Sequence, residues 1–344
     1  MSAPTAPIAL PVTGVPVTTA SAATLEDSSA AGSRRTVGLL LGVGSALAFS
    51  SSGPFVKPLL EAGWSLGAAL VLRMGIAAVL LTPWLVRAVL RERRAIVRNW
   101  RLIVGLGLTG MAGCQLFYFA ALQRMPVAMA LLIQYLAPVL LVLLAWARTR
   151  RIPSRLVMAG SVVSIAGLVL VVDIAGARFD LLGTLFALCA AMCAGAYFLM
   201  LERTPDDLPP LALAASGLWV GALLMGVLIG VGVLPFAAPA VDVVLGGVTI
   251  PWWAAIGWIA CVATALAYAL GVRAIPLLGS RVASFVGLSE ALFALAFAWL
   301  LLSEQPTIVQ GLGGILIIGG VILVRRDRER QESSRARSMR GRMR

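Results

Sequence analysis

Apolar residues fill ten stretches of the chain, and short polar segments separate them. Most of the stretches approach the roughly 20 residues that an α-helix needs to cross a bilayer. None alternates apolar and polar residues as a barrel strand does. The pattern therefore predicts an all-α polytopic membrane protein with ten transmembrane helices. The stretches lie at 37–57, 65–86, 101–122, 127–147, 156–172, 181–201, 211–233, 253–274, 281–303 and 307–324.

The composition excludes a soluble chain. Hydrophobic residues make up 60% of the 344 and charged residues 12%, with a mean hydropathy of +0.95. Soluble domains carry about 25% charged residues. There is no His, which excludes Ser-His-Asp triads, Cys-His pairs and His-rich zinc sites. The four Cys are scattered over three apolar stretches, so neither a metal site nor a cofactor is predicted.

The basic residues predict the orientation in the membrane. If the N-terminus is cytoplasmic, 24 of the 28 basic residues face the cytoplasm. Lys57, Arg124 and Arg178 then lie outside, and Arg73 lies within a span. The positive-inside rule thus predicts that both termini lie in the cytoplasm. The location that we expect for this multi-pass chain is the inner (plasma) membrane. Since the net charge of +13 flanks the spans, no nucleic-acid partner is expected.

The two halves of the chain resemble each other. Tyr118 and Pro126 recur as Tyr268 and Pro276, and from Trp146 onward the register shift is a constant 153 residues. The residues matched at that shift are Trp146 with Trp299, Pro153 with Pro306, Ser154 with Thr307, Gly160 with Gly313, and Gly167 with Gly320. Each half has five helices, an odd number, so the second half enters the membrane from the opposite side. The sequence thus predicts two inverted five-helix repeats, the arrangement of many secondary transporters.

These patterns divide the chain into four parts. They are a disordered cytoplasmic N-terminal tail at 1–33, a first repeat at 34–172, a second repeat at 173–324 and a basic cytoplasmic tail at 325–344.

Two ionisable residues lie near span centres, Arg73 in the second and Glu290 in the ninth. A charge there costs at least about 2.5–3.5 kcal/mol, so each needs a partner or a wet cavity. They either pair with each other or nearby polar groups and hold the bundle together, or they bind substrate. In the second case Arg73 receives a carboxylate, and Glu290 receives an ammonium group or a proton. Glu290 is the better candidate for proton coupling, because guanidinium stays charged.

Neutral polar side chains accompany these charges. They either form helix–helix hydrogen bonds or line a substrate path. The candidates are Ser51, Gln115, Tyr118, Gln134, Tyr135, Tyr197, Tyr268 and Ser289. Pro54 and Pro138 are expected to free backbone carbonyls in the first and fourth helices.

Two further charged residues lie toward the outer ends of their helices. Lys57, near the outer mouth, either snorkels or forms a salt bridge, or it attracts an anionic substrate group. Glu304, at an outer helix junction, is expected to act as a cap or in an ion pair.

The chain resembles the EamA-type transporters of the drug/metabolite transporter superfamily over residues 37–324. The residues that carry the resemblance are Lys57, Leu72-Arg73, 116–122 with Pro126, 135–138, 289–290 and 301–307. The resemblance implies a ten-helix basket whose central cavity is lined by helices one to four and six to nine. It also implies export or exchange of amino acids and other small metabolites. The chain departs from the family in having Glu290-Ala291 for Glu-Pro, and Arg151 for an acid.

We therefore expect a secondary transporter that exports amino acids or related small metabolites by alternating access. No nucleotide-binding P-loop is present, so a proton or ion gradient is the expected energy source. Multidrug or organic-cation efflux is an alternative function. A membrane-embedded enzyme is not expected, because Glu290 is the lone acid at membrane depth. A non-transporting sensor or scaffold, with the basic tail recruiting a partner or anionic lipid, is an alternative of another class.

Overall fold

The computed structural model describes residues 36–150, 154–172, 180–201, 204–205, 208–305 and 307–323. The predicted tails at 1–33 and 325–344, together with Arg151 and Arg178, lie outside the described residues.

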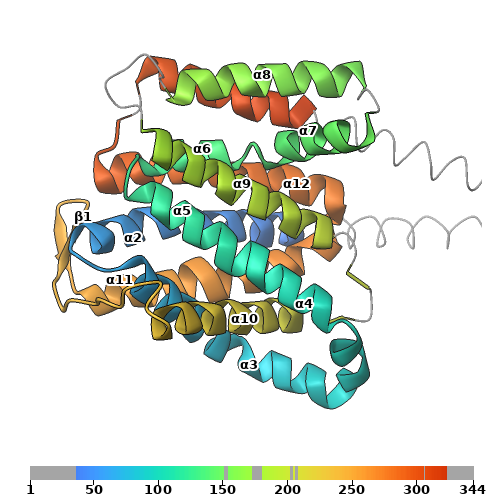
Figure 1. Ribbon diagram of the computed structural model, residues 1–344, viewed down its shortest axis with the longest axis vertical. Helices are drawn as coiled ribbons and strands as arrows, with labels where there is room; N and C mark the ends of the chain where they lie inside the picture. The colour runs from blue at the N-terminus through green and yellow to red at the C-terminus, as the bar shows by residue number, and fades with distance from the viewer. Residues whose placement is uncertain are drawn as a thin grey trace, which may run out of the picture.

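Helices account for most of the described chain (Figure 1). The elements are the N-terminal helix (36–50), α2 (Ser52–Glu61), α3 (Leu66–Arg98), α4 (Trp100–Leu106), η1 (Gly107–Gly113), α5 (Cys114–Leu122), α6 (Val127–Gln134), α7 (Ala137–Thr149), α8 (Arg155–Val172), α9 (Leu181–Leu201), α10 (Pro210–Gly230), β1 (Val243–Leu245), β2 (Val248–Ile250), α11 (Trp252–Ala260), η2 (Cys261–Leu266), α12 (Ala267–Leu302) and the C-terminal helix (Ile308–Leu323).

Seven described helices are long and apolar enough to cross a membrane. They are Thr36–Glu61, Leu66–Arg98, Trp100–Leu122, Val127–Leu144, Leu181–Leu201, Pro210–Gly230 and Trp252–Ala274. Three shorter apolar helices lie at Arg155–Leu170, Ser289–Leu302 and Ile308–Leu323, within the remaining predicted spans. The chain is therefore a multi-pass membrane protein.

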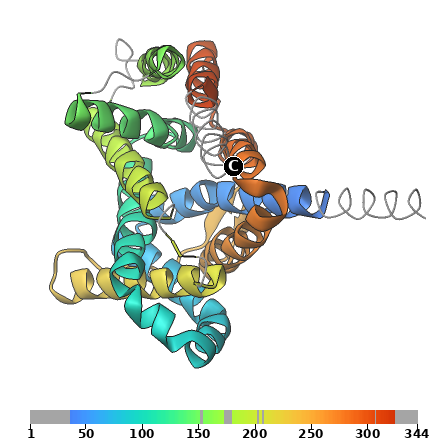
Figure 2. The same cartoon turned by 90° about the vertical axis from the view of Figure 1, so that its right-hand side faces the viewer.

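The helices lie side by side along one direction, with the β1–β2 hairpin at one end of the bundle and the last turns of α3 at the other (Figure 1). The N-terminal helix lies against α12 (Figure 2), where Ser45 Oγ donates to the carbonyl of Ala267 at 2.8 Å. Most of the buried apolar side chains belong to one continuous core, which includes Leu70, Phe119 and Ile259 from different helices. Segments far apart in the sequence thus share the interior of the bundle.

The first and fourth spans are each interrupted by a turn near the proline that the sequence predicts to free a backbone carbonyl. The first span has a turn at Ser51, three residues before Pro54. The fourth divides into α6 and α7 at Tyr135 and Leu136, and Pro138 lies in the first turn of α7. A proline inside a helix removes one backbone hydrogen bond and displaces the preceding turn. Polar side chains lie at both breaks, Ser51 at the first and Tyr135 at the second.

The third and eighth spans each contain a π-helical segment, η1 and η2. A π turn inserts an extra residue into an α-helix, and such insertions occur often at functional sites. Gln115 lies just after η1, and Thr264 lies within η2. The two irregular segments therefore carry polar side chains into the core.

Three parts of the structure differ from the predicted pattern. Helix α3 continues to Arg98, beyond the predicted end at 86, with non-helical φ/ψ at Glu92. The charges after 86 mark the membrane boundary but do not stop a helix. Helix α12 runs without a break to Leu302, where two separate spans were predicted.

The third difference is the β1–β2 hairpin, which departs from the all-α prediction. It pairs Val243 with Ile250 in antiparallel register. Its turn contains Gly246 and Gly247, both with positive φ (59° and 79°). Two positive φ values in succession suit a two-residue hairpin turn between β-branched segments.

Helix α8 and the C-terminal helix pack closely through small residues, at one edge of the molecule (Figure 2). A Cβ added at Gly167 would lie 2.6 Å from the carbonyl oxygen of Gly313. A Cβ added at Gly320 would lie 2.4 Å from the carbonyl oxygen of Gly160. As residue numbers rise along α8, the numbers of their contacts fall, so the two helices are antiparallel.

Candidate functional site

Arg73 is the centre of a buried polar cluster. It lies on α3 and is 2% exposed. Its Nε donates to Oγ1 of Thr264 at 2.7 Å, and its Nη1 donates to Oγ of Ser52 at 2.7 Å and to Oε1 of Gln115 at 2.9 Å. These partners come from η2, α2 and α5. One guanidinium group therefore joins four parts of the bundle.

All of these partners are neutral. The guanidinium also lies over the ring of Phe119, with Cζ 5.4 Å from the ring centroid. Within the described part of the chain Arg73 has no carboxylate in ion-pair range, and its Nη2 has no hydrogen-bond acceptor. Dipoles hold the charge in place without neutralising it. The group thus keeps a donor and a positive charge for an anion.

Glu290 lies in α12 beside the break between α6 and α7. A side-chain hydrogen bond joins it to Tyr135. The side chain is partly exposed, unlike that of Arg73. Arg73 and Glu290 are close enough to interact electrostatically, yet no ion pair joins them. Among the described residues the two charges do not pair directly, whereas Arg73 bonds to nearby polar groups, which is the other form of the structural role expected from the sequence.

Gln134 is the last residue of α6, and Cys114 connects it to the two charged residues. Its Nε2 contacts Sγ of Cys114 at 3.4 Å, and Cys114 interacts electrostatically with both Arg73 and Glu290. The other amide atom, Oε1, is buried and has no hydrogen-bond partner among the described residues. A buried acceptor without a donor is costly, and such an atom calls for an explanation. An incoming donor from a ligand would satisfy it.

Besides Tyr135, three other predicted tyrosines lie near this cluster. Tyr118 is buried on α5, and a Cβ added at Gly53 would lie 2.7 Å from its hydroxyl. Tyr268 packs edge-on against Phe49, with ring centroids 4.8 Å apart. The ring of Tyr197 packs against η1, where a Cβ added at Gly110 would lie 2.2 Å from it. Tyr118 is thus the tyrosine that shares α5 with Gln115, one of the partners of Arg73.

The two predicted serines bond mainly to their own helices. Ser51 Oγ donates to the carbonyl of Ala48 at 2.7 Å and accepts from Nε1 of Trp258 at 3.0 Å. Ser289 Oγ donates to the carbonyl of Val286 at 2.6 Å. Neither hydroxyl contacts Arg73.

Two partners of Arg73 were not among the predicted site residues. Ser52 adjoins Ser51 in a run of three serines, and that run could have indicated Ser52 as a site residue. Thr264 stands in an otherwise apolar stretch, and its Oγ1 also donates to the carbonyl of Ile259 at 2.8 Å. The hydroxyl of Thr264 within a predicted span could likewise have indicated it as a site residue.

Lys57, Val127 and Glu304 form a second polar group, here called the outer clasp after the side of the membrane that the positive-inside rule predicts for it. Lys57 Nζ forms an ion pair with Oε1 of Glu304, and the backbone N–H of Val127 donates to Oε2 of Glu304 at 2.9 Å. Val127 begins α6 and follows Pro126, which has no side-chain donor or acceptor to cap the helix. Glu304 therefore acts both as a helix cap and in an ion pair, as the sequence predicts. Lys57 forms a salt bridge, one of the roles proposed for it.

The comparisons with known proteins identify the family. The sequence profile of the EamA-like transporter family matches residues 36–173 and 181–326. The chain belongs to the EamA-like transporter family. A "Probable terminal-alkyne amino-acid exporter" from Streptantibioticus cattleyicolor is 27% identical over 283 residues, covering 81% of this chain and 90% of its own. A crystal structure of a protein is also similar, with a TM-score of 0.48 and 22% identity, over 88% of this chain and 99% of its own.

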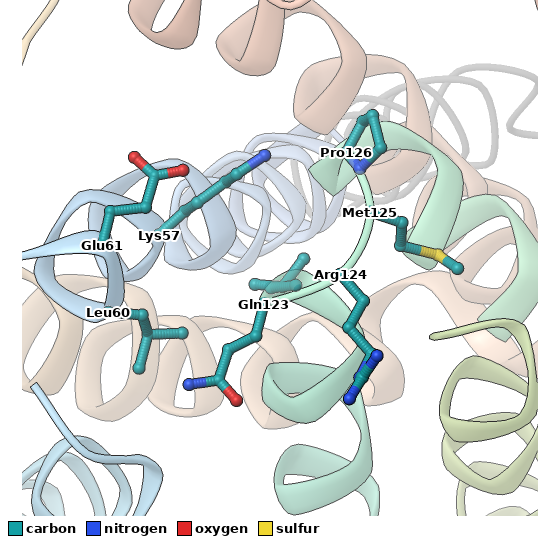
Figure 3. Close-up of a pocket in the computed structure, with 8 residues that line it drawn as sticks. Lys57, Leu60, Glu61, Gln123, Arg124, Met125 and Pro126 are labelled. Carbon is teal, nitrogen blue, oxygen red and sulfur yellow. The ribbon is translucent and has the colours of Figure 1, made fainter. Parts of the chain in front are cut away.

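The outer clasp of this EamA-like transporter borders a pocket of about 430 Å³ (Figure 3). Lys57 extends across it toward Pro126, and Gln123 and Arg124 line the other side. Arg124 also pairs with Asp180 at 3.3 Å, an exposed contact. The pocket and both ion pairs lie at the ends of the spans, away from Arg73. Neither the pocket lining nor the two ion pairs include a residue that bonds to Arg73.

Proposed function

We propose that this EamA-like transporter exports amino acids or related small metabolites, and that it binds them between Arg73 and Glu290. The observation that carries the proposal is the set of unused groups in the polar cluster. Nη2 of Arg73 has no acceptor and Oε1 of Gln134 has no donor among the described residues. An amino acid supplies a carboxylate for the first. It supplies an ammonium group for the second and for Glu290.

The relative named as an amino-acid exporter supports this substrate class. A zwitterion also fits the electrostatics, because it adds one charge of each sign to a site that holds one of each, at Arg73 and Glu290. An organic cation matches Glu290 alone and leaves Arg73 repelling it. The two charges therefore favour an amino acid over a cationic drug.

Ten spans arranged as two inverted repeats are the proposed architecture. The family profile matches twice, once in each half. The antiparallel contacts between α8 and the C-terminal helix also support it. Under the 153-residue shift, the contact of Gly167 with Gly313 maps onto the contact of Gly320 with Gly160. Ser164 Oγ lies 3.4 Å from the carbonyl oxygen of Ile317. The 153-residue shift matches Ser164 with Ile317, so this contact joins two equivalent positions of the repeats. Self-matching contacts are typical of two units related by a two-fold axis.

Alternating access is the proposed mechanism, with both termini in the cytoplasm. The outer clasp joins Lys57 and Val127 of the first half to Glu304 of the second. While it holds, the halves are held together at their outer ends. Rocking of the halves would separate Glu304 from its partners and open the outer side to Arg73. Glu290 would couple the cycle to protons, because a proton and a substrate ammonium group compete for the same carboxylate.

Counterflow into liposomes that contain the purified protein tests the function. Labelled amino acids, organic cations and sugars are supplied separately, with the unlabelled compound inside. Saturable uptake of amino acids supports the proposal. Uptake of organic cations alone would establish multidrug efflux instead, and no uptake of any compound by correctly inserted protein would contradict transport of these classes.

A further inference from the structure

A second cleft, of about 760 Å³, lies at the other end of the bundle from the outer clasp. The N-terminal helix, α3, α10 and α12 line it, so it lies between the two halves of the chain. Arg87 and Arg91 enter it from α3 and Arg273 from α12. All three belong to the segments that the positive-inside rule predicts to be cytoplasmic.

The charges of the cleft favour an anion. The three arginines are exposed, and within the described residues none of them forms an ion pair. The lining has a single acid, Glu92. Glu92 is also the residue at which α3 leaves helical geometry, with φ −135° and ψ 39°. The basic end of α3 therefore changes direction at the cleft.

The walls of the cleft are apolar. Leu41, Trp84 and Leu211 line it from three different helices. Trp84 is 38% exposed and lies one turn before Arg87. An aromatic side chain beside arginines at the end of a span is typical of the level of the lipid headgroups. The cleft thus offers charge for a headgroup and apolar surface for an acyl chain.

We propose that this cleft binds one anionic phospholipid of the cytoplasmic leaflet. The phosphate lies among Arg87, Arg91 and Arg273, and an acyl chain packs on Leu41, Trp84 and Leu211. A free phosphate ion would use the arginines but leave the apolar walls uncovered. Basic pockets between helices on the cytoplasmic side of membrane proteins bind anionic headgroups in this way. The proposal rests on the predicted orientation and is independent of the transported substrate.

Quenching of tryptophan fluorescence by brominated lipid tests the site directly. The full chain is reconstituted into phosphatidylcholine vesicles that contain a minority of brominated phosphatidylglycerol, or the same amount of brominated phosphatidylcholine. We expect stronger quenching by the phosphatidylglycerol, and we expect the excess to disappear in Trp84→Phe. In Arg87→Gln/Arg91→Gln/Arg273→Gln the affinity should fall on the order of a hundredfold, at about fivefold for each arginine.

A matched variant keeps the test decisive. Arg93→Gln/Arg94→Gln/Arg101→Gln removes the same charge from exposed positions outside the cleft, and it should keep the excess quenching. Equal quenching by both lipids in the wild-type protein would overturn the proposal. So would the same loss in both triple variants, because it would show general attraction to an anionic surface. The readout needs no transport, so failure of the proposed export function would leave it unaffected.

Discussion

The proposed role of Arg73 predicts a specific loss of carboxylate recognition. We compare an amino acid with its primary amide, in which a neutral carboxamide replaces the carboxylate. Wild-type protein should bind the acid more tightly than the amide, since Nη2 of Arg73 can donate to a carboxylate. In Arg73→Lys the positive charge remains, but the planar fork that reaches Thr264, Ser52 and Gln115 together is lost.

The size of the effect follows from the site. Loss of the fork removes a charge-assisted hydrogen bond to the carboxylate, worth about 1.5–3 kcal/mol, while the charge remains. The preference for acid over amide should therefore fall by at least about tenfold, taking about 1.5 kcal/mol as the lower bound. The hydrogen bond from Nε to Thr264 is also lost, at about 1.5–3 kcal/mol for a charged donor. Part of that cost is offset, because the lysine ammonium group in Arg73→Lys needs fewer hydrogen-bond acceptors and can be hydrated.

Titration calorimetry on the purified protein measures both ligands. Thr264→Val is the matched control, because it removes one partner of Arg73 and leaves the guanidinium group present. It should lower the thermal stability to a similar extent and keep the preference for the acid. If Arg73→Lys kept the wild-type ratio of the two affinities, or if Thr264→Val lost it equally, Arg73 would be a structural residue and the reasoning would be refuted.

Three further changes test other parts of the molecule. Glu290→Gln should reduce transport without affecting insertion or folding, and normal flux with a normal pH profile would exclude the coupling role. Glu304→Gln breaks the partly buried clasp and should lower the unfolding free energy by about 1–3 kcal/mol, whereas Asp180→Asn, in an exposed pair, should cost less than about 1 kcal/mol in thermal denaturation. Gly320→Ala places a Cβ 2.2 Å from Oγ of Ser164 and should lower the unfolding free energy by about 1–3 kcal/mol. Gly319→Ala, with nothing within 4 Å of the added Cβ, should leave it unchanged. Equal melting temperatures of the two variants would contradict the close packing of α8 and the C-terminal helix.

The spans and their breaks could be predicted because each depends on local sequence. A long apolar stretch must be helical in lipid, and Pro54 and Pro138 interrupt the helix wherever the stretch lies. A cap or ion-pair role for Glu304 could be predicted for the same reason, since it is an acid at a helix junction. That it caps α6, 177 residues away, could not. The hairpin was missed, although Gly246 and Gly247 stand between β-branched residues.

The partners of Arg73 depend on how each helix is rotated, and an apolar sequence hides that rotation. Adjacent residues on an α-helix differ by about 100° in direction. Ser51 therefore faces Trp258 while Ser52 faces Arg73, and a run of hydroxyls does not distinguish the two. When every face of a helix is apolar, the hydrophobic pattern gives no direction either. The π turn in η2 further rotates Thr264 relative to a regular helix.

The bonds of Arg73 also set an order for the molecule's assembly during synthesis. Thr264 follows Arg73 by 191 residues, and Glu304 follows Val127 by 177. When the first half leaves the ribosome and enters the bilayer, Arg73 can bond to Ser52 and Gln115, which are already made. Nε of Arg73 and the N–H at the start of α6 find their acceptors, Thr264 and Glu304, only after the second half has been translated. The first half therefore enters the membrane with unsatisfied polar groups, and the arrival of the second half completes them.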